Sequence, residues 1–514
     1  MSIERRVKIV ATLGPAVASP DRLSDLLRAG ADMVRINAAH GSAETRARLI
    51  ADVRAAAADV GKKVPILFDL RGLKIRTGPL APEEPSERDG RKLSKNQEPQ
   101  QELGPEEHDD KFSPPKGVPF ARGSEVAIYP EPVPARPGQI GIDYPDLLDV
   151  IGPGSRMLIS DGLIELLVDR LENGKAICKV SRGGLLLGKQ GVTLPGAAIV
   201  GGSMTAADRE DVAFAVSQGV DFLGLSFIND ASDLVLARGV AAAHGPHSPG
   251  LIAKIERPDA LNNVREIASQ ADGLMVARGD LGVQLPPEQV PRAQKKIIST
   301  ANNLGVPVIT ATQMLESMIT QPMATRAETS DVANAVWDGT DAVMLSAETA
   351  VGQFPVEAVE TMTRIILEAE RDGPIRTAAA AEPLPSGRDV SLAFADAIAR
   401  ATFALAETAP AEHILVFTLT GTAARRVAKY RPRPPIIAVT TDEGSARRLN
   451  LVWGVRAVVV PLETDPDKMF RIAGRAIIEE GLAHQDEYAL IVGSLPMMKV
   501  AGRTNLVHVR KLGT

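Results

Sequence analysis

The sequence predicts an α/β protein built on a (β/α)8 TIM barrel, with a small inserted β domain and a C-terminal α/β open-sheet domain. Three observations support this prediction. Eight short apolar runs alternate with segments of helical periodicity, a long stretch without that rhythm follows the third run, and five further apolar runs follow the eighth. Strand–helix alternation is typical of a parallel sheet, and eight such units are enough to close a barrel.

The runs that we expect to form barrel strands share a strand-like length and an apolar composition. They are residues 7–14, 32–37, 65–70, 221–227, 251–256, 273–280, 306–312 and 341–348. Segments with helical patterning, such as "PDRLSDLLRAGA" and "RAQKKIISTANNLG", lie between most of them. A strand-length apolar run can also be part of a buried helix, so periodicity alone leaves that alternative open.

The long stretch between the third and fourth runs predicts a small β domain at residues 78–180. It contains short strand-like segments joined by glycine-containing turns, such as "GSEVAIYP" and "GKAICKVSRGG". Residues 82–119 inside it are polar and rich in proline, and they cannot bury enough apolar surface to offset the entropy cost of ordering. We therefore expect a flexible excursion there, and a barrel made of residues 1–77 and 181–373.

A linker is expected at residues 374–388, followed by an α/β domain at 389–514. Five apolar segments read as its strands: "HILVFTLTG", "PIIAVTTD", "RAVVVPLE", "YALIVGS" and "NLVHVRKL". Helical segments such as "TAARRVAKY" separate the first four of these strands. This alternation predicts an open, mainly parallel sheet.

Composition narrows the classes of partner and compartment. Apolar residues make up 44% of the chain and charged residues 24%, which is ordinary for a globular protein. The net charge of −6 argues against nucleic acid or a membrane surface as the main partner. The chain has one cysteine, Cys178, which excludes an internal disulfide and a cysteine-based metal cluster. The segment "MSIERRVKIVATLG" has no signal-peptide character, so we expect a cytoplasmic protein without membrane helices.

Polar side chains gather where the predicted barrel strands end, which is where the active sites of such barrels lie. In strand order, they are Arg35 and Asn37; Asp69, with Arg71, Lys74 and Arg76 just beyond; Lys254 and Glu256; Arg278, Gly279 and Asp280; Thr310 and Thr312; and Ser346 and Glu348. Basic groups, carboxylates and hydroxyls are therefore expected to converge on one mouth.

The pattern "LIAKIERP" places Lys254 and Glu256 on one face of a strand, because strand side chains alternate. Glu256 and Asp280, on adjacent strands, suit Mg²⁺, which is held by one or two carboxylates together with substrate phosphates. Several cations around such an ion suit the transfer of a phosphoryl group between two anions. A purely structural Lys254–Glu256 pair at the barrel mouth remains the alternative.

Longer blocks carry a family resemblance. They include "VKIVATLGPA", "MVRINAAHG", "KIRTG", "GVTLPG", "AKIER", "VARGDLGV", "VITATQMLESM" and "TRAETSDVANAVWDGTDAVMLSAETAVG". With these blocks the chain resembles the pyruvate kinase family over nearly its whole length. The resemblance implies a (β/α)8 barrel, a lid inserted after the third strand and a C-terminal regulatory domain, which agrees with the organisation predicted above.

The resemblance also implies roles for individual residues. Glu256 and Asp280 would bind a divalent ion, Mg²⁺ with Mn²⁺ as a substitute, and Lys254 would stabilise the transferring phosphoryl group. Gly279 and Thr312, together with Asp280, would hold the substrate phosphoenolpyruvate. Further implied roles are phosphate contacts for Arg35 and Arg76, and part of the proton route for Thr312 and Ser346. The residues implied to contact ADP or ATP are Arg35, Asn37, His40, Arg76 and Lys189. A packed or solvated histidine is the alternative for His40.

The sequence departs from the family's pattern at two places, the monovalent-cation site and the nucleotide contact of the lid. Many relatives bind a monovalent cation, but here the positions matching its serine and threonine ligands are Ala39 and Leu70, while Asn37 and Asp69 are kept. Lys74 stands where potassium-dependent relatives carry a glutamate, so we expect its ammonium to replace K⁺; a merely solvated lysine is the alternative. In the lid, relatives often carry a basic residue that reaches the nucleotide. Here the segment "GKQGVTLPG" has Lys189 with Gln190 beside it, so either of these two positions could be the one that makes this contact.

The C-terminal segment "TLTGTAARR" suggests a site for a phosphorylated effector. By resemblance, Thr418, Thr420, Gly421 and Thr422 would hold its phosphate, with a simple helix cap as the alternative. The later loop "GSLPMMKVAGRTN" leaves open whether the ligand is a bisphosphate, a monophosphate, a nucleotide or nothing. The resemblance further implies a homotetramer.

The reaction implied is the last step of glycolysis, from phosphoenolpyruvate and ADP to pyruvate and ATP. Two rival functions remain at this stage. One is a Mg²⁺-dependent lyase or aldolase barrel, which would share the carboxylate pair but need neither the lid nor the set of Arg35, Arg76 and Lys254. The other is a catalytically silent metabolite sensor, against which the intact Lys254, Glu256, Asp280 and Thr312 argue.

Overall fold

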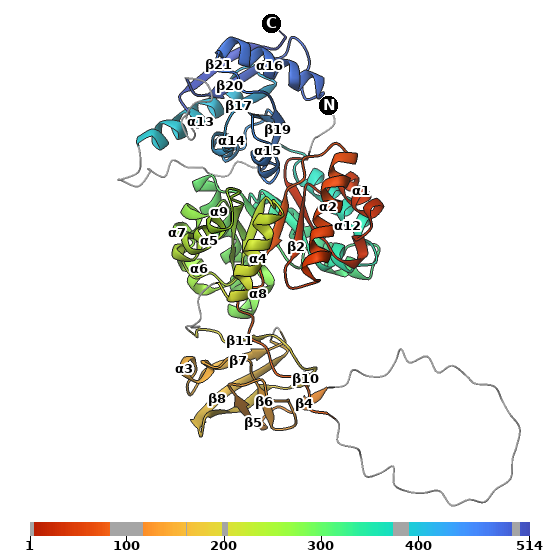
Figure 1. The fold of residues 1–514 in the computed structure, drawn as a ribbon, viewed down its shortest axis with the longest axis vertical. Coiled ribbons are helices and arrows are strands. Elements are labelled where there is room, and N and C mark those ends of the chain that lie inside the picture. The colour runs from red at the N-terminus through yellow and green to blue at the C-terminus, as the bar shows by residue number, and fades with distance from the viewer. Residues whose placement is uncertain are drawn as a thin grey trace, which may run out of the picture. The chain divides into compact units, whose positions relative to one another are not determined.

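The computed structural model describes residues 5–82, 117–160, 162–197, 204–373, 390–495 and 504–513. The chain forms two compact units, one made of residues 1–73 and 201–514 and the other of residues 74–200 (Figure 1). The expected linker at 374–388 and most of the expected excursion at 82–119 lie outside the described residues.

A closed barrel of eight parallel strands forms the core of the first unit, in the order β1-β16-β15-β14-β13-β12-β3-β2. Its strands are β1 (Lys8–Thr12), β2 (Met33–Asn37), β3 (Ile66–Asp69), β12 (Phe222–Leu225), β13 (Gly250–Ile255), β14 (Gly273–Ala277), β15 (Val308–Ala311) and β16 (Ala342–Leu345). All eight expected strands are confirmed; β13 has the length of its predicted run, shifted by one residue, and the other seven are shorter than theirs.

Helices follow the barrel strands and cover the outside of the barrel (Figure 1). They are α1 (Pro20–Ala29), α2 (Ala43–Asp59), α4 (Ala206–Ser217), α5 (Ala231–Ala243), α6 (Pro258–Asn262), α7 (Val264–Gln270), α8 (Arg278–Gln284), α9 (Val290–Leu304), α10 (Arg326–Trp337), α11 (Ala347–Ala350) and α12 (Pro355–Ala369). Short 3₁₀ turns lie at Pro15–Val17, Pro287–Gln289 and Glu316–Ile319.

Local sequence fixes where several of these helices begin. Thr205 caps α4 and Thr325 caps α10, each by accepting from the backbone N–H three residues later while an acidic side chain, Asp208 or Glu328, reaches back to the cap. A cap of this kind contributes about 1 kcal/mol to helix stability. These helices therefore start at defined residues, which fixes the ends of the loops that precede them.

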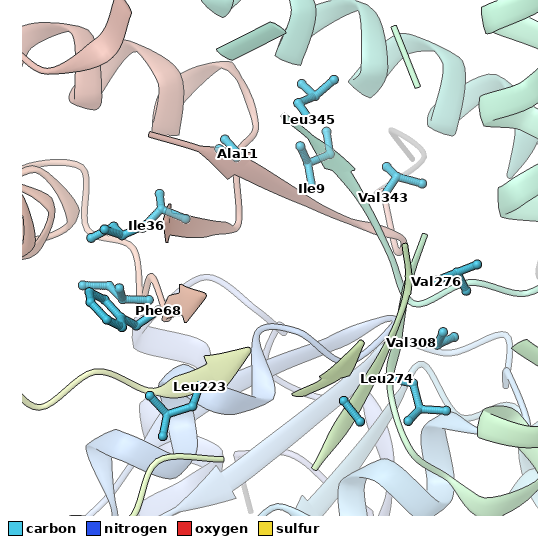
Figure 2. Packing of buried hydrophobic residues seen from close by; sticks show 14 of the residues in the cluster. Ile9, Ala11, Ile36, Phe68, Leu223, Leu274, Val276, Val308, Val343 and Leu345 are labelled. Carbon is cyan, nitrogen blue, oxygen red and sulfur yellow. The ribbon is translucent and has the colours of Figure 1, made fainter. Parts of the chain in front are cut away.

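Strand side chains alternate between two apolar clusters. Ile9, Phe68, Leu223 and Leu274 point outward toward the helices, in the cluster drawn in Figure 2. Inward-facing residues form a separate buried cluster that fills the barrel: Val10, Met33, Leu67, Phe222, Ile252, Met275, Ile309, Ala311, Ala342 and Met344, with Leu451. Burying a side chain of this size contributes about 1.5–3 kcal/mol. Because the period is two, the inward positions after this cluster open at the barrel mouth.

The second unit is a small β domain, as expected. Its main sheet has the order β11-β7-β8-β9-β5-β6, and β10 pairs with β4. Its elements are β4 (Val118–Phe120), β5 (Glu125–Tyr129), β6 (Gln139–Gly141), α3 (Leu147–Val150), β7 (Arg156–Ile159), β8 (Ile164–Glu172), β9 (Lys175–Arg182), β10 (Gly184–Leu186) and β11 (Val192–Thr193). The unit extends past residue 180 because β10 and β11 pair with β4 and β7. Cys178 lies on β9 and is buried.

The C-terminal part of the first unit contains an open sheet in the order β19-β18-β17-β20-β21. Its elements are α13 (Val390–Thr408), β17 (His413–Phe417), α14 (Thr422–Ala428), β18 (Ile436–Thr440), α15 (Glu443–Leu449), β19 (Val455–Val459), α16 (Pro466–Glu479), β20 (Tyr488–Gly493) and β21 (Leu506–Lys511). The five expected strands are confirmed; four are parallel and β21 is antiparallel. Arg447 of this sheet domain pairs with the buried Asp221 of the barrel at 2.7 Å.

Candidate active site

Lys254 stands at the centre of a charge cluster at the carboxyl ends of the barrel strands. Its side chain is 11% exposed, and its Nζ lies 2.8 Å from Glu256 Oε1 and 3.4 Å from Asp69 Oδ1. Burial alone would lower the pKa of Lys254, but the carboxylates of Asp69 and Glu256 outweigh it and hold that pKa above its ordinary value. Lys254 is therefore a fixed cation, and its expected placement on one face with Glu256 is confirmed.

Arg35 is anchored beside Lys254 by the same aspartate. Its Nε donates to Asp69 Oδ2 at 2.8 Å, and its Nη1 donates to Thr12 Oγ1 at 3.3 Å. Burial would raise the pKa of Asp69, but Lys254 and Arg35 reverse the effect and lower it. Asp69 is thus an ionised carboxylate that orients two cations toward the mouth.

Two residues that sequence reasoning missed support this cluster. Lys254 Nζ donates to Ser226 Oγ at 2.9 Å, and that hydroxyl donates to Leu70 O at 3.0 Å. Gly224 lies opposite Asp69, and a Cβ atom there would come within 2.7 Å of Asp69 Oδ1. The serine near the carboxyl end of the fourth apolar run, residues 221–227, was a usable signal for Ser226. The need for glycine at position 224 follows only from the strand pairing.

Glu256 and Asp280 form a donor set that fits a divalent ion. Glu256 is 1% exposed and its Oε2 accepts from the backbone N–H of Phe227 at 2.8 Å. Burial raises the pKa of Glu256; Lys254 opposes this, while Asp280 adds to it. Asp280 is exposed, and within the described ranges its carboxylate makes no hydrogen bond or ion pair. Two neighbouring carboxylates are what Mg²⁺ uses when substrate phosphates complete its shell.

Gly279 and Thr312 come together as expected. The backbone N–H of Gly279 donates to Thr312 Oγ1 at 2.8 Å, and that hydroxyl donates to Ala311 O at 2.6 Å. Thr312 has φ 69° and Gln313 has φ 55°. Left-handed backbone costs a residue with a side chain roughly 1–3 kcal/mol, and such strain tends to occur at functional sites. The loop after β15 is therefore held in a conformation that it would not adopt alone.

Thr310 corrects the sequence prediction. It was expected at the mouth with Thr312, but it is fully buried and its Oγ1 donates to Thr340 Oγ1 at 3.0 Å. Its strand neighbours Ile309 and Ala311 belong to the inward cluster, so Thr310 faces the helices. Thr312 reaches the mouth because the strand ends at Ala311.

Ser346 opens onto a cavity of about 920 Å³ next to Arg35. The cavity is also lined by Asn37 and His40, together with apolar residues such as Leu13. The Oγ atom of Ser346 is buried, and within the described residues it has no hydrogen-bond partner. The cavity therefore combines a buried hydroxyl, a guanidinium and an apolar wall in one place. Asn37 Oδ1 itself accepts from the N–H of Ala39 at 3.0 Å.

Three further predicted site residues, Arg76, Lys189 and Lys74, belong to the second unit. Arg76 is exposed, and its Nη1 donates to Lys189 O at 3.0 Å. Lys189 is exposed, and its ammonium makes no hydrogen bond or ion pair within the described part of the chain. Gln190 Oε1 instead accepts from Ser160 inside the lid. Lys74 is exposed as well.

The C-terminal loop after β17 is built differently from a side-chain-capped helix start. Gly421, in left-handed conformation, is the N-cap of α14 and no side chain caps that position. The Gly421 N–H donates to Thr418 Oγ1 at 3.0 Å, and the hydroxyls of Thr420 and Thr422 lie 3.0 Å apart. A cavity of about 280 Å³ is lined by residues 420–422 with Arg425 and Arg448. The second expected effector loop lies mostly outside the described residues.

Among the described residues, no group of three or more His, Cys, Asp or Glu side chains is arranged to hold a metal ion. None of the helices in the described ranges combines the length and apolar character that crossing a bilayer requires.

Comparison with known proteins gives a consistent result. The model of the pyruvate kinase barrel domain matches residues 4–109 and 104–359, and that of the pyruvate kinase alpha/beta domain matches residues 396–510. The chain is 40% identical to pyruvate kinase of Geobacillus stearothermophilus, covering 99% of this chain and 80% of the relative. It is 36% identical to pyruvate kinase of Methylorubrum extorquens, covering 99% and 98%.

Structural comparison agrees with these matches. A crystal structure of a pyruvate kinase from Cryptosporidium parvum superposes with a TM-score of 0.85 at 32% identity, covering 99% of this chain and 96% of that one. The expected fold, phosphotransferase activity and family are thus confirmed, and the rival lyase and sensor functions are set aside. The chain belongs to the pyruvate kinase family, enzymes that generally require a divalent metal and convert phosphoenolpyruvate and ADP to pyruvate and ATP.

Proposed function

We propose that the charge cluster around Lys254 carries the pyruvate kinase reaction of this chain. In that reaction the bond between phosphorus and the enol oxygen of phosphoenolpyruvate breaks, and a bond to an oxygen of the ADP β-phosphate forms. The enolate then takes up a proton at carbon to become pyruvate. The observation that carries the proposal is the ammonium of Lys254, held 2.8 Å from Glu256 and 3.4 Å from Asp69 beside an uncommitted Asp280.

Glu256 and Asp280 would hold Mg²⁺, with Mn²⁺ as a substitute that uses the same oxygen ligands. When bound, the ion draws negative charge away from the oxygens of the two substrates. Glu256 is oriented for this role by the N–H of Phe227, and Asp280 by its place in the first turn of α8. Both residues follow neighbouring strands, β13 and β14, which brings their carboxylates to one side of the mouth.

Cations then neutralise the migrating phosphoryl group. Lys254 faces it from inside the barrel, and Arg35 on β2, fixed by Asp69, also contacts phosphate. Arg76 and Lys189 of the lid contact nucleotide phosphates. Phosphoryl transfer needs little covalent participation from the protein, so positioning and electrostatic stabilisation supply most of the catalysis.

The other substrate contacts are part of the same proposal. The Gly279 N–H and the Thr312 hydroxyl bind the carboxylate of phosphoenolpyruvate. Thr312 and Ser346 take part in delivering the proton to the enolate, through water rather than as single acids, because a hydroxyl donates poorly without a relay. Asn37 and His40 line the cavity that receives the nucleotide.

A coupled assay for pyruvate tests this function directly. Pyruvate formation from phosphoenolpyruvate should require both ADP and a divalent ion, and ATP should appear in equal amount. Release of pyruvate at the same rate without ADP would indicate a phosphatase or lyase and would contradict the proposal. Absence of turnover under every condition would indicate a sensor.

Potassium independence is the second part of the proposal. Both oxygens of Asp69 face the cations Lys254 and Arg35, Asn37 Oδ1 is used by its own loop, and Ala39 has no side-chain oxygen. The oxygens that would bind a monovalent cation are therefore few or already engaged. The ammonium of Lys74 supplies the missing charge, since it is a compact cation on a flexible stem.

Initial rates with and without KCl test this point. We expect the rate in K⁺-free buffer and in about 100 mM KCl to differ by less than about threefold, because no ion-binding step remains. A rise of about tenfold or more would contradict it. In Lys74→Met the rate should fall. Lys179→Met, which replaces an exposed lid lysine, is the matched control and should behave as the parent.

An anionic effector is proposed for the C-terminal loop. Thr418, Thr420, Gly421 and Thr422 form the loop. Arg425 lies beside them, and burial lowers its pKa while Asp272 opposes this and Arg448 adds to it; a bound anion would favour the charged guanidinium. Thr418 would act by fixing Gly421 rather than by direct contact. Saturation curves for phosphoenolpyruvate, measured with sugar phosphates and nucleoside monophosphates, should shift with one of them; no shift with any would contradict the assignment.

A homotetramer in the cytoplasm completes the proposal. Large apolar side chains are exposed in the barrel part of the chain, among them Met323 and Trp337, and on α13 at Phe394 and Leu405. Exposed apolar side chains of this size suit burial between the chains of an assembly. Light scattering of the purified chain should give four times the mass of one chain; a monomer mass would contradict the assembly.

A further inference from the structure

Arg278 holds the backbone of the loop that carries Thr312. Its side chain is 9% exposed. The guanidinium Nη2 donates to Thr312 O at 2.6 Å and to Gln313 O at 3.2 Å, while Nε lies 3.3 Å from Ala311 O. One buried side chain therefore contacts the carbonyl groups of three consecutive residues.

The hydrogen bonds from Arg278 are made to the strained part of the loop. Thr312 and Gln313 both have positive φ, and Thr312 is β-branched, a residue type for which that conformation is an outlier. Such backbone persists only where the surroundings over-determine it. The planar fork of a guanidinium offers several donors in fixed directions, which a lysine ammonium does not.

The next residue holds the other side of Thr312. The backbone N–H of Gly279 donates to Thr312 Oγ1 at 2.8 Å. Arg278 itself is fixed from outside the loop by Asp331 on α10, with Nη1 2.7 Å from Asp331 Oδ2. Arg278 and Gly279, at the start of α8, thus fix the positions of the carbonyl and the hydroxyl of Thr312. The ion pair with α10 in turn fixes Arg278.

We infer that Arg278 is a positioning residue that holds the Thr312 hydroxyl and the Gly279 N–H in the geometry that receives the substrate carboxylate. This inference rests on the roles proposed above for Gly279 and Thr312. The guanidinium is engaged by carbonyl oxygens and by Asp331, so it acts through the loop and does not touch the substrate. Its loss should weaken the binding of phosphoenolpyruvate and leave the binding of ADP unchanged.

Steady-state kinetics of Arg278→Lys separates this role from a general loss of structure. We expect the KM for phosphoenolpyruvate to rise about tenfold or more while the KM for ADP stays within about twofold. The inhibition constant of oxalate, a planar carboxylate probe, should rise by the same factor as the KM. Asp331→Asn, which keeps Arg278 but loosens it, should move both quantities in the same direction by a smaller factor.

Arg54→Lys is the matched control. Arg54 also donates to two backbone carbonyls, Val64 O and Gly219 O, and to a buried aspartate, but at residues that precede β3 and β12. It should lower the unfolding temperature without changing the KM for phosphoenolpyruvate. Equal rises in both KM values for Arg278→Lys, or the same selective rise in Arg54→Lys, would overturn the inference.

Thr312→Val distinguishes failure of this inference from failure of the proposed function. If Thr312→Val raises the KM for phosphoenolpyruvate and the oxalate constant but Arg278→Lys and Asp331→Asn do not, Arg278 has no positioning role and the role of Thr312 stands. If Thr312→Val changes neither quantity, both the proposed role of Thr312 and the inference built on it are wrong.

Discussion

Replacing Lys254 by methionine is expected to reduce kcat about 10²- to 10³-fold, with a smaller effect on the KM for ADP. Methionine keeps the volume of the side chain but removes the cation that lies 2.8 Å from Glu256. A unit charge pair at about 4 Å and an effective dielectric near 20 is worth roughly 4 kcal/mol before desolvation. That is enough to account for the loss at the phosphoryl-transfer step.

Two comparisons make the Lys254 result interpretable. Lys296→Met removes an exposed lysine of α9 whose Nζ donates to Leu261 O, and it should retain parental kcat. Lys254→Met also leaves the buried Asp69 and Glu256 without their shared cation, so its thermal unfolding should be measured alongside the kinetics. A folded Lys254→Met enzyme that makes ATP at the parental rate would contradict the proposed mechanism.

Asp280→Asn is expected to raise the Mg²⁺ concentration needed for half-maximal activity about tenfold or more, because one of two carboxylate ligands loses its charge. The change should also appear without turnover, as weaker binding of Mn²⁺ measured by electron paramagnetic resonance. Within the described residues the carboxylate of Asp280 makes no hydrogen bond or ion pair, so its replacement leaves the hydrogen bonds of the surrounding loop in place.

Asp259→Asn provides the control for that experiment. Asp259 is exposed and also lies in the first turn of a short helix after a barrel strand, but it belongs to α6. Its replacement should leave both Mn²⁺ binding and the Mg²⁺ requirement unchanged. Unaltered Mn²⁺ affinity in Asp280→Asn would remove that residue from the metal site and would leave Glu256 to be tested in the same way.

The barrel could be predicted from the sequence because its strands are buried on both faces and therefore read as continuous apolar runs. The pairing of Lys254 with Glu256 followed from the two-residue period alone. The same rule, applied without knowing where β15 ends, misplaced Thr310, since a shift of one residue turns a side chain to the other face. Predictions from periodicity are thus only as good as the strand ends on which they depend.

Other features had no local signal. Ser226 and Gly224 matter because β12 lies beside β3 and β13, and this adjacency of segments distant in sequence is a property of the closed barrel. The left-handed backbone at Thr312 contradicts the preference of threonine and is imposed by tertiary contacts. The strands β10 and β11 have three and two residues, too few to show a period.

The buried position of Cys178 has a practical consequence. Burial raises the pKa of this thiol to about 12, so almost none of the reactive thiolate forms at neutral pH. Since the chain has no second cysteine, alkylating reagents have one possible target, and it is shielded while β9 keeps its place in the lid sheet. The rate of thiol labelling in denaturant therefore reports the unfolding of the lid alone, separately from that of the barrel.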